Sequence, residues 1–248
     1  MSVTSSIPLL ETIGLSKSFG GALAVNNVSL RVAEGEILGI AGPNGSGKST
    51  LFNIITSVPF KADRGRVLFR GTEIQHWPSH KIAAHGLART FQRESVFASL
   101  SAIDNVMVAI DAVAPSEPLA ARERRAAAAL DSVGFPATLH NVIAGGLPVL
   151  LRKLVMIGSA MALQPRLFLL DEPASGLTPP EIERVRALIL KLRAGGITIL
   201  LIEHVLSLLS GVSDRLVVLD QGSVIAEGAP RDVIADPAVV EAYLGSAA

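Results

Sequence analysis

The sequence contains no cysteine. This excludes a disulfide framework, a zinc–thiolate site and a cysteine nucleophile, and it fits a reducing compartment. The sequence also has no excess charge of either sign, because 22 basic side chains balance 22 acidic ones. Proteins that bind nucleic acid by neutralising phosphates carry basic surfaces, and one Trp, one Tyr and eight Phe leave few rings for base stacking. We therefore expect no nucleic-acid partner.

Long hydrophobic runs are missing as well, although the composition is unusually apolar. Hydrophobic residues make up 49% of the 248 residues and charged residues 18%, whereas about 25% is charged in typical soluble domains. The mean hydropathy is +0.47. Yet no apolar run reaches the roughly 18 residues that suggest a membrane span, and the N-terminal residues lack the basic and apolar regions of a signal peptide. A hydrophobic chain with no span and no signal peptide needs another explanation.

Short apolar segments predict an α/β fold with a mainly parallel sheet. Two of them, separated by glycine turns, are typical of antiparallel strands: residues 9–13 and 24–32. Four continuous runs are typical of strands covered on both faces: residues 37–41, 167–170, 197–202 and 216–219.

Helices are predicted between these strands. One begins at Lys48 and ends at about Thr56, and another covers Pro179–Leu192, after Thr178 and before Gly195. The alanine-rich middle of the chain, from Ile103 to Leu163, has no strand pattern, so we expect an inserted helical subdomain there.

Residues 42–50 read Gly-Pro-Asn-Gly-Ser-Gly-Lys-Ser-Thr and match the phosphate-loop pattern G-x-x-x-x-G-K-[ST]. A predicted strand precedes the loop and a predicted helix begins within it, as the pattern requires. Glycines let successive backbone N–H groups surround phosphate oxygens, and the helix N-terminus adds its dipole. The residues predicted to bind the nucleotide here are Gly42, Asn44, Gly45, Ser46, Gly47, Lys48, Ser49 and Thr50. An ordinary glycine-rich turn before a helix is the alternative interpretation.

Within this loop, three side chains have individual roles in the prediction. Lys48 places a point charge at the β- and γ-phosphates, Ser49 ligates Mg²⁺, and Thr50 contacts the α-phosphate.

Two carboxylates follow the predicted strand at residues 167–170, namely Asp171 and Glu172. In an open α/β sheet, ligands bind beyond the carboxyl ends of the strands. We therefore expect Asp171 to support Mg²⁺, through water, and Glu172 to act as the general base for an attacking water. If no phosphate loop lay beside them, a pair of acidic residues at the surface would be the alternative interpretation.

Two further polar residues follow apolar segments, and each also has a structural interpretation. His204 comes after the strand at residues 197–202 and is predicted to sense the γ-phosphate and orient the water; a lone His is otherwise usually structural. Gln92 comes after the stretch Leu87–Phe91 and is predicted to reach the metal or the water; the alternative is a loop amide at the surface.

These residues, in this order, resemble the motifs of the ATP-binding-cassette ATPases over nearly the whole chain. The matching motifs are Walker A at 42–50, the Q-loop Gln92, Walker B at 167–171 with Glu172, a D-loop-like segment at 175–178, and the switch His204. The chain is specifically similar to the ATPase subunits of branched-chain (hydrophobic) amino-acid importers in KSFGGALAVNNVSL, GPNGSGKSTLFNIIT, PSHKIAAHGLARTFQ, LLIEHV and the tail VIAEGAP…VVEAYLG.

The resemblance implies a P-loop NTPase (RecA-like) fold within one ATPase domain, residues 1–248. The implied parts are an antiparallel β subdomain at about 8–35 and 64–76, a RecA-like core at about 36–60, 86–92 and 164–248, and a helical subdomain at about 93–163. It also implies ATP and Mg²⁺ as cofactors. Phe19 then stacks on adenine and Val25 lies beside it; a core position is the alternative for Phe19.

The resemblance further implies that the chain powers uptake as part of an importer. The implied partners are a second ATPase subunit, two transmembrane permease subunits and, indirectly, a periplasmic or extracellular substrate-binding protein. The chain would then lie peripherally on the cytoplasmic face of the plasma (inner) membrane, and its apolar helical subdomain would dock a permease helix. That assignment explains a hydrophobic chain without a membrane span.

One motif departs from the family. The signature, Leu-Pro-Tyr-Gly-x-Gln in these importers, is expected at Leu147, where the sequence reads Leu-Pro-Val-Leu-Leu-Arg-Lys through Lys153. Leu150 replaces the glycine through which the backbone approaches the partner's γ-phosphate, and its Cβ is expected to block that contact. An alternative register four residues upstream, at Ile143, would push Pro148 deeper into the helix, where it costs a hydrogen bond.

The altered signature favours an asymmetric heterodimer over a homodimer, because the residues that hydrolyse this chain's own ATP are complete. Two other functions stay open. They are a cassette ATPase for another substrate (urea, short amides, lipopolysaccharide) and a nucleotide-gated scaffold that does not hydrolyse ATP. A soluble cassette acting on nucleic acid is disfavoured by the neutral charge.

Overall fold

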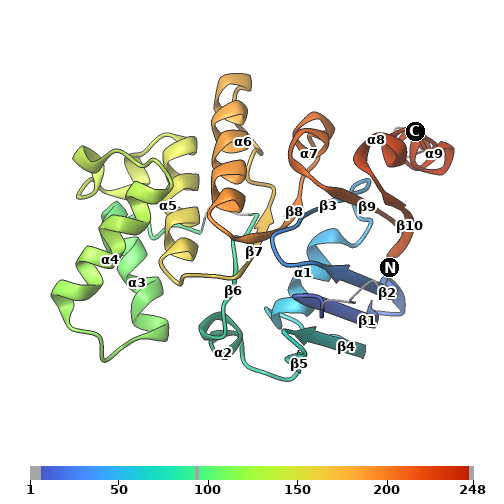
Figure 1. Ribbon diagram of the computed structural model, residues 1–248, viewed down its shortest axis with the longest axis horizontal. Helices are drawn as coiled ribbons and strands as arrows, with labels where there is room; N and C mark the ends of the chain where they lie inside the picture. The colour runs from blue at the N-terminus through green and yellow to red at the C-terminus, as the bar shows by residue number, and fades with distance from the viewer. Residues whose placement is uncertain (1–6, 93–94, 246–248) are drawn as a thin grey trace, which may run out of the picture.

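The computed structural model describes residues 7–92 and 95–245, and its core is a six-stranded sheet (Figure 1). The strand order is β10-β9-β3-β8-β7-β6. Four neighbouring pairs in this order are parallel, and β10 joins β9 antiparallel. The strands are β3 (Ile37–Ala41), β6 (Leu87–Arg89), β7 (Leu167–Asp171), β8 (Thr198–Ile202), β9 (Arg215–Asp220) and β10 (Ser223–Gly228).

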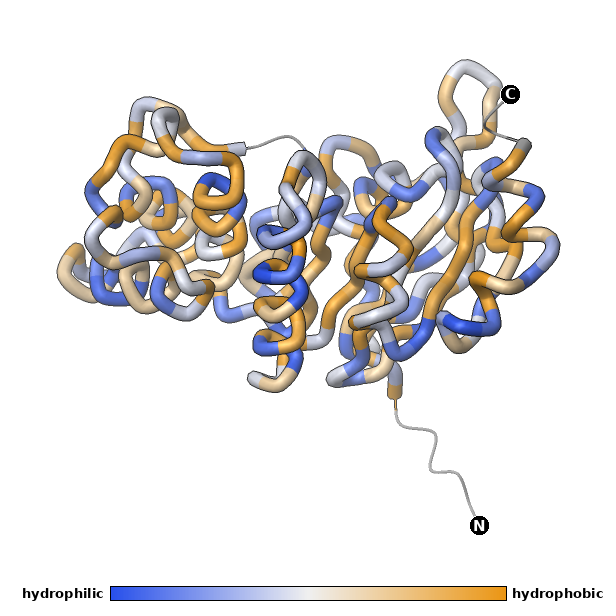
Figure 2. The backbone as a smooth tube through the Cα atoms, turned by 90° about the horizontal axis from the view of Figure 1, so that it is seen from above, coloured by the Kyte–Doolittle hydropathy of each residue, from blue (hydrophilic) through white to orange (hydrophobic). Residues whose placement is uncertain are grey.

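Burial on both faces explains the continuous apolar runs of the central strands. All residues of β3, β7 and β8 are buried. In Figure 2 the hydrophobic segments follow the core strands, whereas the helices alternate between hydrophilic and hydrophobic residues. Much of the high mean hydropathy therefore comes from strands that lie inside the molecule.

A second sheet, of order β2-β1-β4-β5, is antiparallel throughout. Its strands are β1 (Leu10–Phe19), β2 (Ala22–Val32), β4 (Arg64–Phe69) and β5 (Thr72–Glu73). β1 extends well beyond the predicted residues 9–13, because Gly14, with a φ of 58°, accommodates an irregularity in the pairing instead of ending the strand.

The helix that follows the phosphate loop, α1 (Lys48–Thr56), joins the two sheets. Leu51, Phe52, Ile54 and Ile55 are fully buried in one cluster with residues of both sheets. Because α1 cannot shift without disturbing this core, its N-terminal end is held in place at the edge of the parallel sheet.

Helices make up the middle of the chain, as predicted. α3 (Ala102–Val113), α4 (Leu119–Ser132) and α5 (Val149–Met161) form a lobe at one end of the molecule (Figure 1). The remaining helices are α2 (Ser79–Ala84), α6 (Pro179–Ala194), α7 (Leu206–Val212), α8 (Pro230–Ile234) and α9 (Pro237–Gly245). Across residues 7–92 and 95–245, no helix combines the length and the apolar character needed to cross a membrane.

Candidate nucleotide site

The phosphate loop connects β3 to α1, and its glycines have backbones that other residues rarely adopt. Gly45 and Gly47 have φ angles of 79° and 102°. A Cβ on Gly47 would lie 2.2 Å from the carbonyl oxygen of Ala24, and one on Gly42 would lie 2.1 Å from that of Leu219. Gly47 caps α1 without a side-chain hydrogen bond. The first amides of the helix are thus not capped by a side chain, which suits an anion.

Lys48 is nearly buried and closes the loop. Its Nζ donates to the carbonyl oxygens of Gly42 and Pro43, each at 2.8 Å. Burial lowers the pKa of Lys48, and the nearby carboxylates of Glu172 and Asp171 oppose that shift. The ammonium group is therefore held between the loop and the two acids.

Glu172 follows β7 and has a left-handed backbone, with a φ of 49°. Left-handed backbone in a residue other than glycine is strained and is often found at functional sites. Gln92 Nε2 donates to Glu172 Oε2 at 3.0 Å, and His204 Nε2 lies 2.6 Å from Glu172 Oε1. The structure thus brings together three residues that sequence analysis had placed after three separate apolar segments.

Asp171, the last residue of β7, forms an ion pair with a residue outside this group. Its Oδ2 pairs with Arg89 Nη2 at 2.8 Å. Its Oδ1 is buried and has no hydrogen-bond partner among the described residues. Burial raises the pKa of Asp171, and the ion pair with Arg89 opposes that shift. One oxygen of the carboxylate is therefore paired and the other is left for a ligand.

A cavity of about 250 Å³ lies over the phosphate loop. Its walls are Ala24, Asn44, Gly45, Ser46, Gly47, Lys48, Ser49, Thr50, Gln92, Glu172 and His204. Seven of the eight predicted phosphate-loop residues thus line one cavity together with Gln92, Glu172 and His204. Gly42 lies at the base of the loop.

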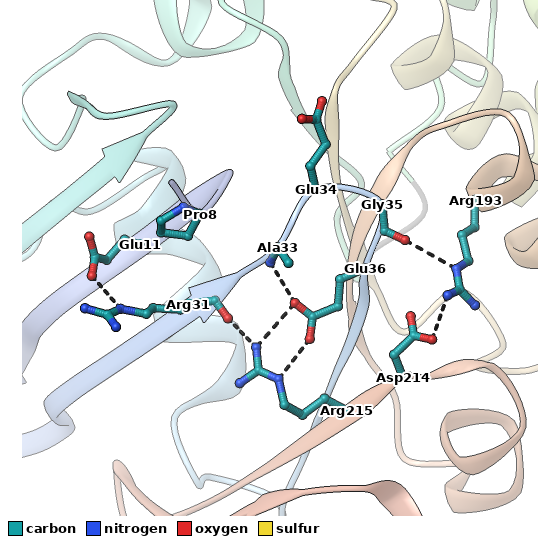
Figure 3. A pocket seen from close by; sticks show the side chains of 10 residues that line it. All are labelled: Pro8, Glu11, Arg31, Ala33, Glu34, Gly35, Glu36, Arg193, Asp214 and Arg215. Carbon is teal, nitrogen blue, oxygen red and sulfur yellow. Dashed lines mark hydrogen bonds and ion pairs between the residues drawn. The ribbon is translucent and has the colours of Figure 1, made fainter. Parts of the chain in front are cut away.

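A larger cavity, of about 660 Å³, lies at the opposite edge of the sheet, beside the start of β3 and β9 (Figure 3). Its charged groups neutralise one another. Arg215 pairs with Glu36, Arg193 with Asp214, and Arg31 with Glu11. Because these cations are already paired, this cavity is a poor phosphate site in spite of its size.

Two residues predicted to contact adenine lie outside the loop cavity. Phe19, at the end of β1, is 40% exposed and packs edge-on against Phe60, with ring centroids 5.0 Å apart. Val25 is fully buried in the core, and its neighbour Ala24 forms part of the cavity wall instead. Strand alternation explains the difference between Val25 and Ala24, because successive side chains of β2 point to opposite faces.

Sequence analysis missed three polar residues near the site. They are Arg89 beside Asp171, Tyr243, whose hydroxyl accepts a hydrogen bond from the Gly42 N–H at 2.8 Å, and Glu203. Glu203 is buried and accepts hydrogen bonds from the N–H groups of Ala174 and His204, at 2.6 and 3.2 Å. A charged residue at the end of an apolar strand was a usable signal for Arg89 and Glu203, whereas no local pattern indicates Tyr243.

The altered signature forms the start of α5, which begins at Val149, directly after Pro148. This supports the register at Leu147, because Pro148 then precedes the helix and costs no hydrogen bond. Leu150 is only 5% exposed, and it packs with the apolar cluster around α4 and α6. At this position the side chain is therefore used for packing within the subunit.

Comparison with known proteins gives the family. A profile described as "ABC transporter" matches residues 25–175, from β2 through the segment after Glu172. The chain belongs to the ABC transporter family. A second profile, described as "Branched-chain amino acid ATP-binding cassette transporter", matches residues 223–248 of this ATP-binding cassette.

Similar proteins extend the match to nearly the whole cassette. The high-affinity branched-chain amino acid transport ATP-binding protein BraF of Pseudomonas aeruginosa is 40% identical over 256 aligned positions, covering 98% of this chain and all of that protein. The lipopolysaccharide export system ATP-binding protein LptB of Acidithiobacillus ferridurans is 35% identical, covering 96% and 97%. The ADP conformation of an ATP-binding cassette of an ABC transporter superposes with a TM-score of 0.85 at 33% identity, covering 97% and 100%.

Proposed function

We propose that this cassette binds ATP with Mg²⁺ and hydrolyses it to drive uptake of branched-chain or other hydrophobic amino acids through partner permease subunits. The observation that carries the hydrolytic part is the position of Glu172. Its carboxylate lies in the wall of the phosphate-loop cavity, and Gln92 and His204 hold one oxygen each. A carboxylate fixed at that place is suited to accept a proton from an attacking water.

The residues present fit a magnesium ion. Mg²⁺ prefers oxygen ligands and keeps several waters. Asp171 offers a buried oxygen that has no hydrogen-bond partner in the described part of the chain, and Ser49 offers a hydroxyl in the cavity wall. Gln92 offers an amide oxygen, because its Nε2 is the atom that donates to Glu172. When bound, the ion supplies charge neutralisation for the β- and γ-phosphates.

Each side chain of the site then has a separate role in binding or hydrolysis. Lys48 places a positive charge near the phosphates, and the amides of residues 44–50 bind phosphate oxygens. Glu172 accepts the proton of the water, and His204 orients that water while it contacts Glu172. Phe19 stacks on adenine from the edge of the antiparallel sheet.

The transport part of the proposal rests on the relatives. BraF is by name a branched-chain amino acid transport protein, and the C-terminal profile carries the same description. LptB belongs by name to lipopolysaccharide export, so a lipid substrate is the second candidate. We propose permease partners and an external binding protein, and a peripheral place on the cytoplasmic face of the membrane. We further propose that the chain divides into an antiparallel, a RecA-like and a helical subdomain.

We propose a heterodimer with a second ATPase, because the signature of this chain lacks the features that contact a partner's ATP. Leu150 packs inward, and a leucine side chain replaces the flexible glycine at this position. A partner with an intact signature would complete the site around this chain's own Glu172. The ATP held by the partner would face the altered signature.

The test is Glu172→Gln in the assembled transporter, with ATP binding, ATP hydrolysis and amino-acid uptake measured separately. We expect binding to persist and both hydrolysis and uptake to be lost. Undiminished uptake with no hydrolysis at this site would indicate the nucleotide-gated scaffold. If the complex hydrolyses ATP but takes up no amino acid, the substrate assignment is refuted, and a lipid is the next substrate to test.

The dimer is tested with the purified chain alone. We expect slow hydrolysis that does not rise cooperatively with protein concentration. Brisk, cooperative hydrolysis by this chain alone would refute the heterodimer and show that the Leu147–Lys153 segment still serves a second site.

A further inference from the structure

Arg89 is a buried cation that none of the predicted functions uses. It is the last residue of β6, and its side chain is 6% exposed, while that of Asp171 is 1% exposed. Its guanidinium contacts groups on every side. Nη2 donates to Asp171 Oδ2 at 2.8 Å, Nη1 to Asn53 Oδ1 at 2.8 Å, and Nε to the carbonyl of Thr90 at 3.2 Å.

Two aromatic rings confine the same group. The guanidinium carbon lies 5.4 Å from the ring centroid of Phe52 and 5.0 Å from that of Phe91. Arginine stacks on aromatic faces while its N–H groups donate in the plane of the fork. The side chain is thus held both by hydrogen bonds and by contact with two aromatic rings.

These contacts join the two elements that carry the proposed metal ligands. Asn53 lies on α1, one turn after Ser49, and Asp171 ends β7. Arg89 bridges them, since one nitrogen of its guanidinium binds Asn53 and another binds Asp171. Arg89 therefore adds a polar link between the elements of Ser49 and Asp171, which the hydrophobic core also holds together.

The bridge also distinguishes the two oxygens of Asp171. Arg89 occupies Oδ2, and Oδ1 has no hydrogen-bond partner within residues 7–92 and 95–245. A buried ion pair is by itself weak evidence for stabilisation, because desolvation offsets the attraction. Buried polar atoms in proteins normally have a hydrogen-bond partner, so a buried, unpaired carboxylate oxygen is explained if it binds a ligand.

We propose that Arg89 is a positioning residue for the metal. It holds Asp171 through Oδ2, directs Oδ1 to the ion, and sets the spacing between Asp171 and Ser49. The inference rests on the proposed function, since it assumes that Asp171 and Ser49 hold Mg²⁺. It assigns Arg89 no contact with the nucleotide or the reacting atoms.

The test measures metal affinity instead of activity. Mn²⁺ binding to the full-length protein with ATP is followed by electron paramagnetic resonance for wild type, Arg89→Met and Arg89→Lys. ATP binding without metal is measured in parallel. Arg166→Met is the matched control, because Arg166 pairs at 3.6 Å with Glu34 and both side chains are more than half exposed.

We expect the Mn²⁺ dissociation constant to rise about 10- to 100-fold in Arg89→Met, as for partners of metal ligands in other sites. Lysine keeps the positive charge but lacks the forked guanidinium group, so Arg89→Lys is expected to recover part of the lost Mn²⁺ affinity. Metal-free ATP binding and the Arg166→Met control are expected to match wild type.

If Arg89→Met does not fold, Asn53→Ala tests the same bridge from its other end and leaves the ion pair intact. We expect a smaller rise in the Mn²⁺ dissociation constant with metal-free ATP binding preserved. Unchanged Mn²⁺ affinity in the folded variants would overturn the proposal. Tighter Mn²⁺ binding would overturn it too, since Arg89 would then compete with the ion. If the wild-type protein does not bind ATP in the absence of metal, the proposed function is refuted instead.

Discussion

Removing one hydroxyl from the C-terminal helix is expected to weaken the phosphate loop about 200 residues away in sequence. Gly42 is buried and lies just beyond the end of β3, and its N–H donates to the hydroxyl of Tyr243 on α9. The carbonyl of the same glycine accepts from Lys48. Burial raises the pKa of Tyr243, with the Gly42 hydrogen bond opposing, so the hydroxyl stays neutral and accepts from Gly42 at physiological pH.

Tyr243→Phe removes that acceptor and leaves a buried donor. Such a loss costs about 1–3 kcal/mol, which corresponds to a decrease of roughly 2–12 °C in Tm for a chain of this size. If the whole cost falls on the loop geometry that binds phosphate, ATP affinity falls by about 5- to 150-fold. Both quantities are expected to decrease because a single residue, Gly42, links Tyr243 to Lys48 through its N–H and its carbonyl.

The assay combines thermal unfolding with ATP titration. Tyr243 is the sole tyrosine of the sequence, so 3-fluorotyrosine labelling gives one ¹⁹F resonance that reports on the loop when ATP binds. Leu244→Ala is the matched control, because Leu244 is 70% exposed on the same helix. Wild-type stability and wild-type ATP affinity in a folded Tyr243→Phe protein would refute the reasoning.

Three further predictions concern the loop and its surroundings. Gly47→Ala is expected to abolish ATP binding, since the left-handed backbone is strained and the Cβ would lie 2.2 Å from the carbonyl of Ala24; calorimetric titration checks it, and normal affinity would contradict it. Thr178→Ala removes the hydroxyl that donates to Glu181 at 2.7 Å at the start of α6, whereas the Thr178 N–H, which donates to the same carboxylate at 2.9 Å, is kept. It is expected to lower the free energy of unfolding by about 0.5–2 kcal/mol without changing ATP affinity, and a loss of affinity would indicate a direct role at the site. Burial raises the pKa of Glu203 in the folded state. The stability that the protonated carboxyl contributes to folding is therefore present below the unfolded pKa and is lost as pH rises through the folded pKa. In Glu203→Gln that pH dependence is expected to disappear from urea unfolding measured across the acidic range, and an unchanged dependence would assign it to another group.

Much of the site could be predicted from short stretches of sequence because parallel strands end at one edge of a sheet. Asp171 and Glu172 lie at the end of β7 and His204 follows β8. β8 lies between β7 and β3, and the phosphate loop follows β3. The order of motifs therefore predicted which residues meet.

The sequence by itself determined the fold class, the phosphate loop, the paired acids and the helical middle, because each depends on local periodicity or on residue types at fixed spacing. Only the tertiary structure decided that Arg89 pairs with Asp171, that Tyr243 supports Gly42, and that Val25 points into the core. The first two pairs are 82 and 201 residues apart. No local pattern encodes such contacts, since they arise when separate strands and helices pack together and bring one buried polar group to another.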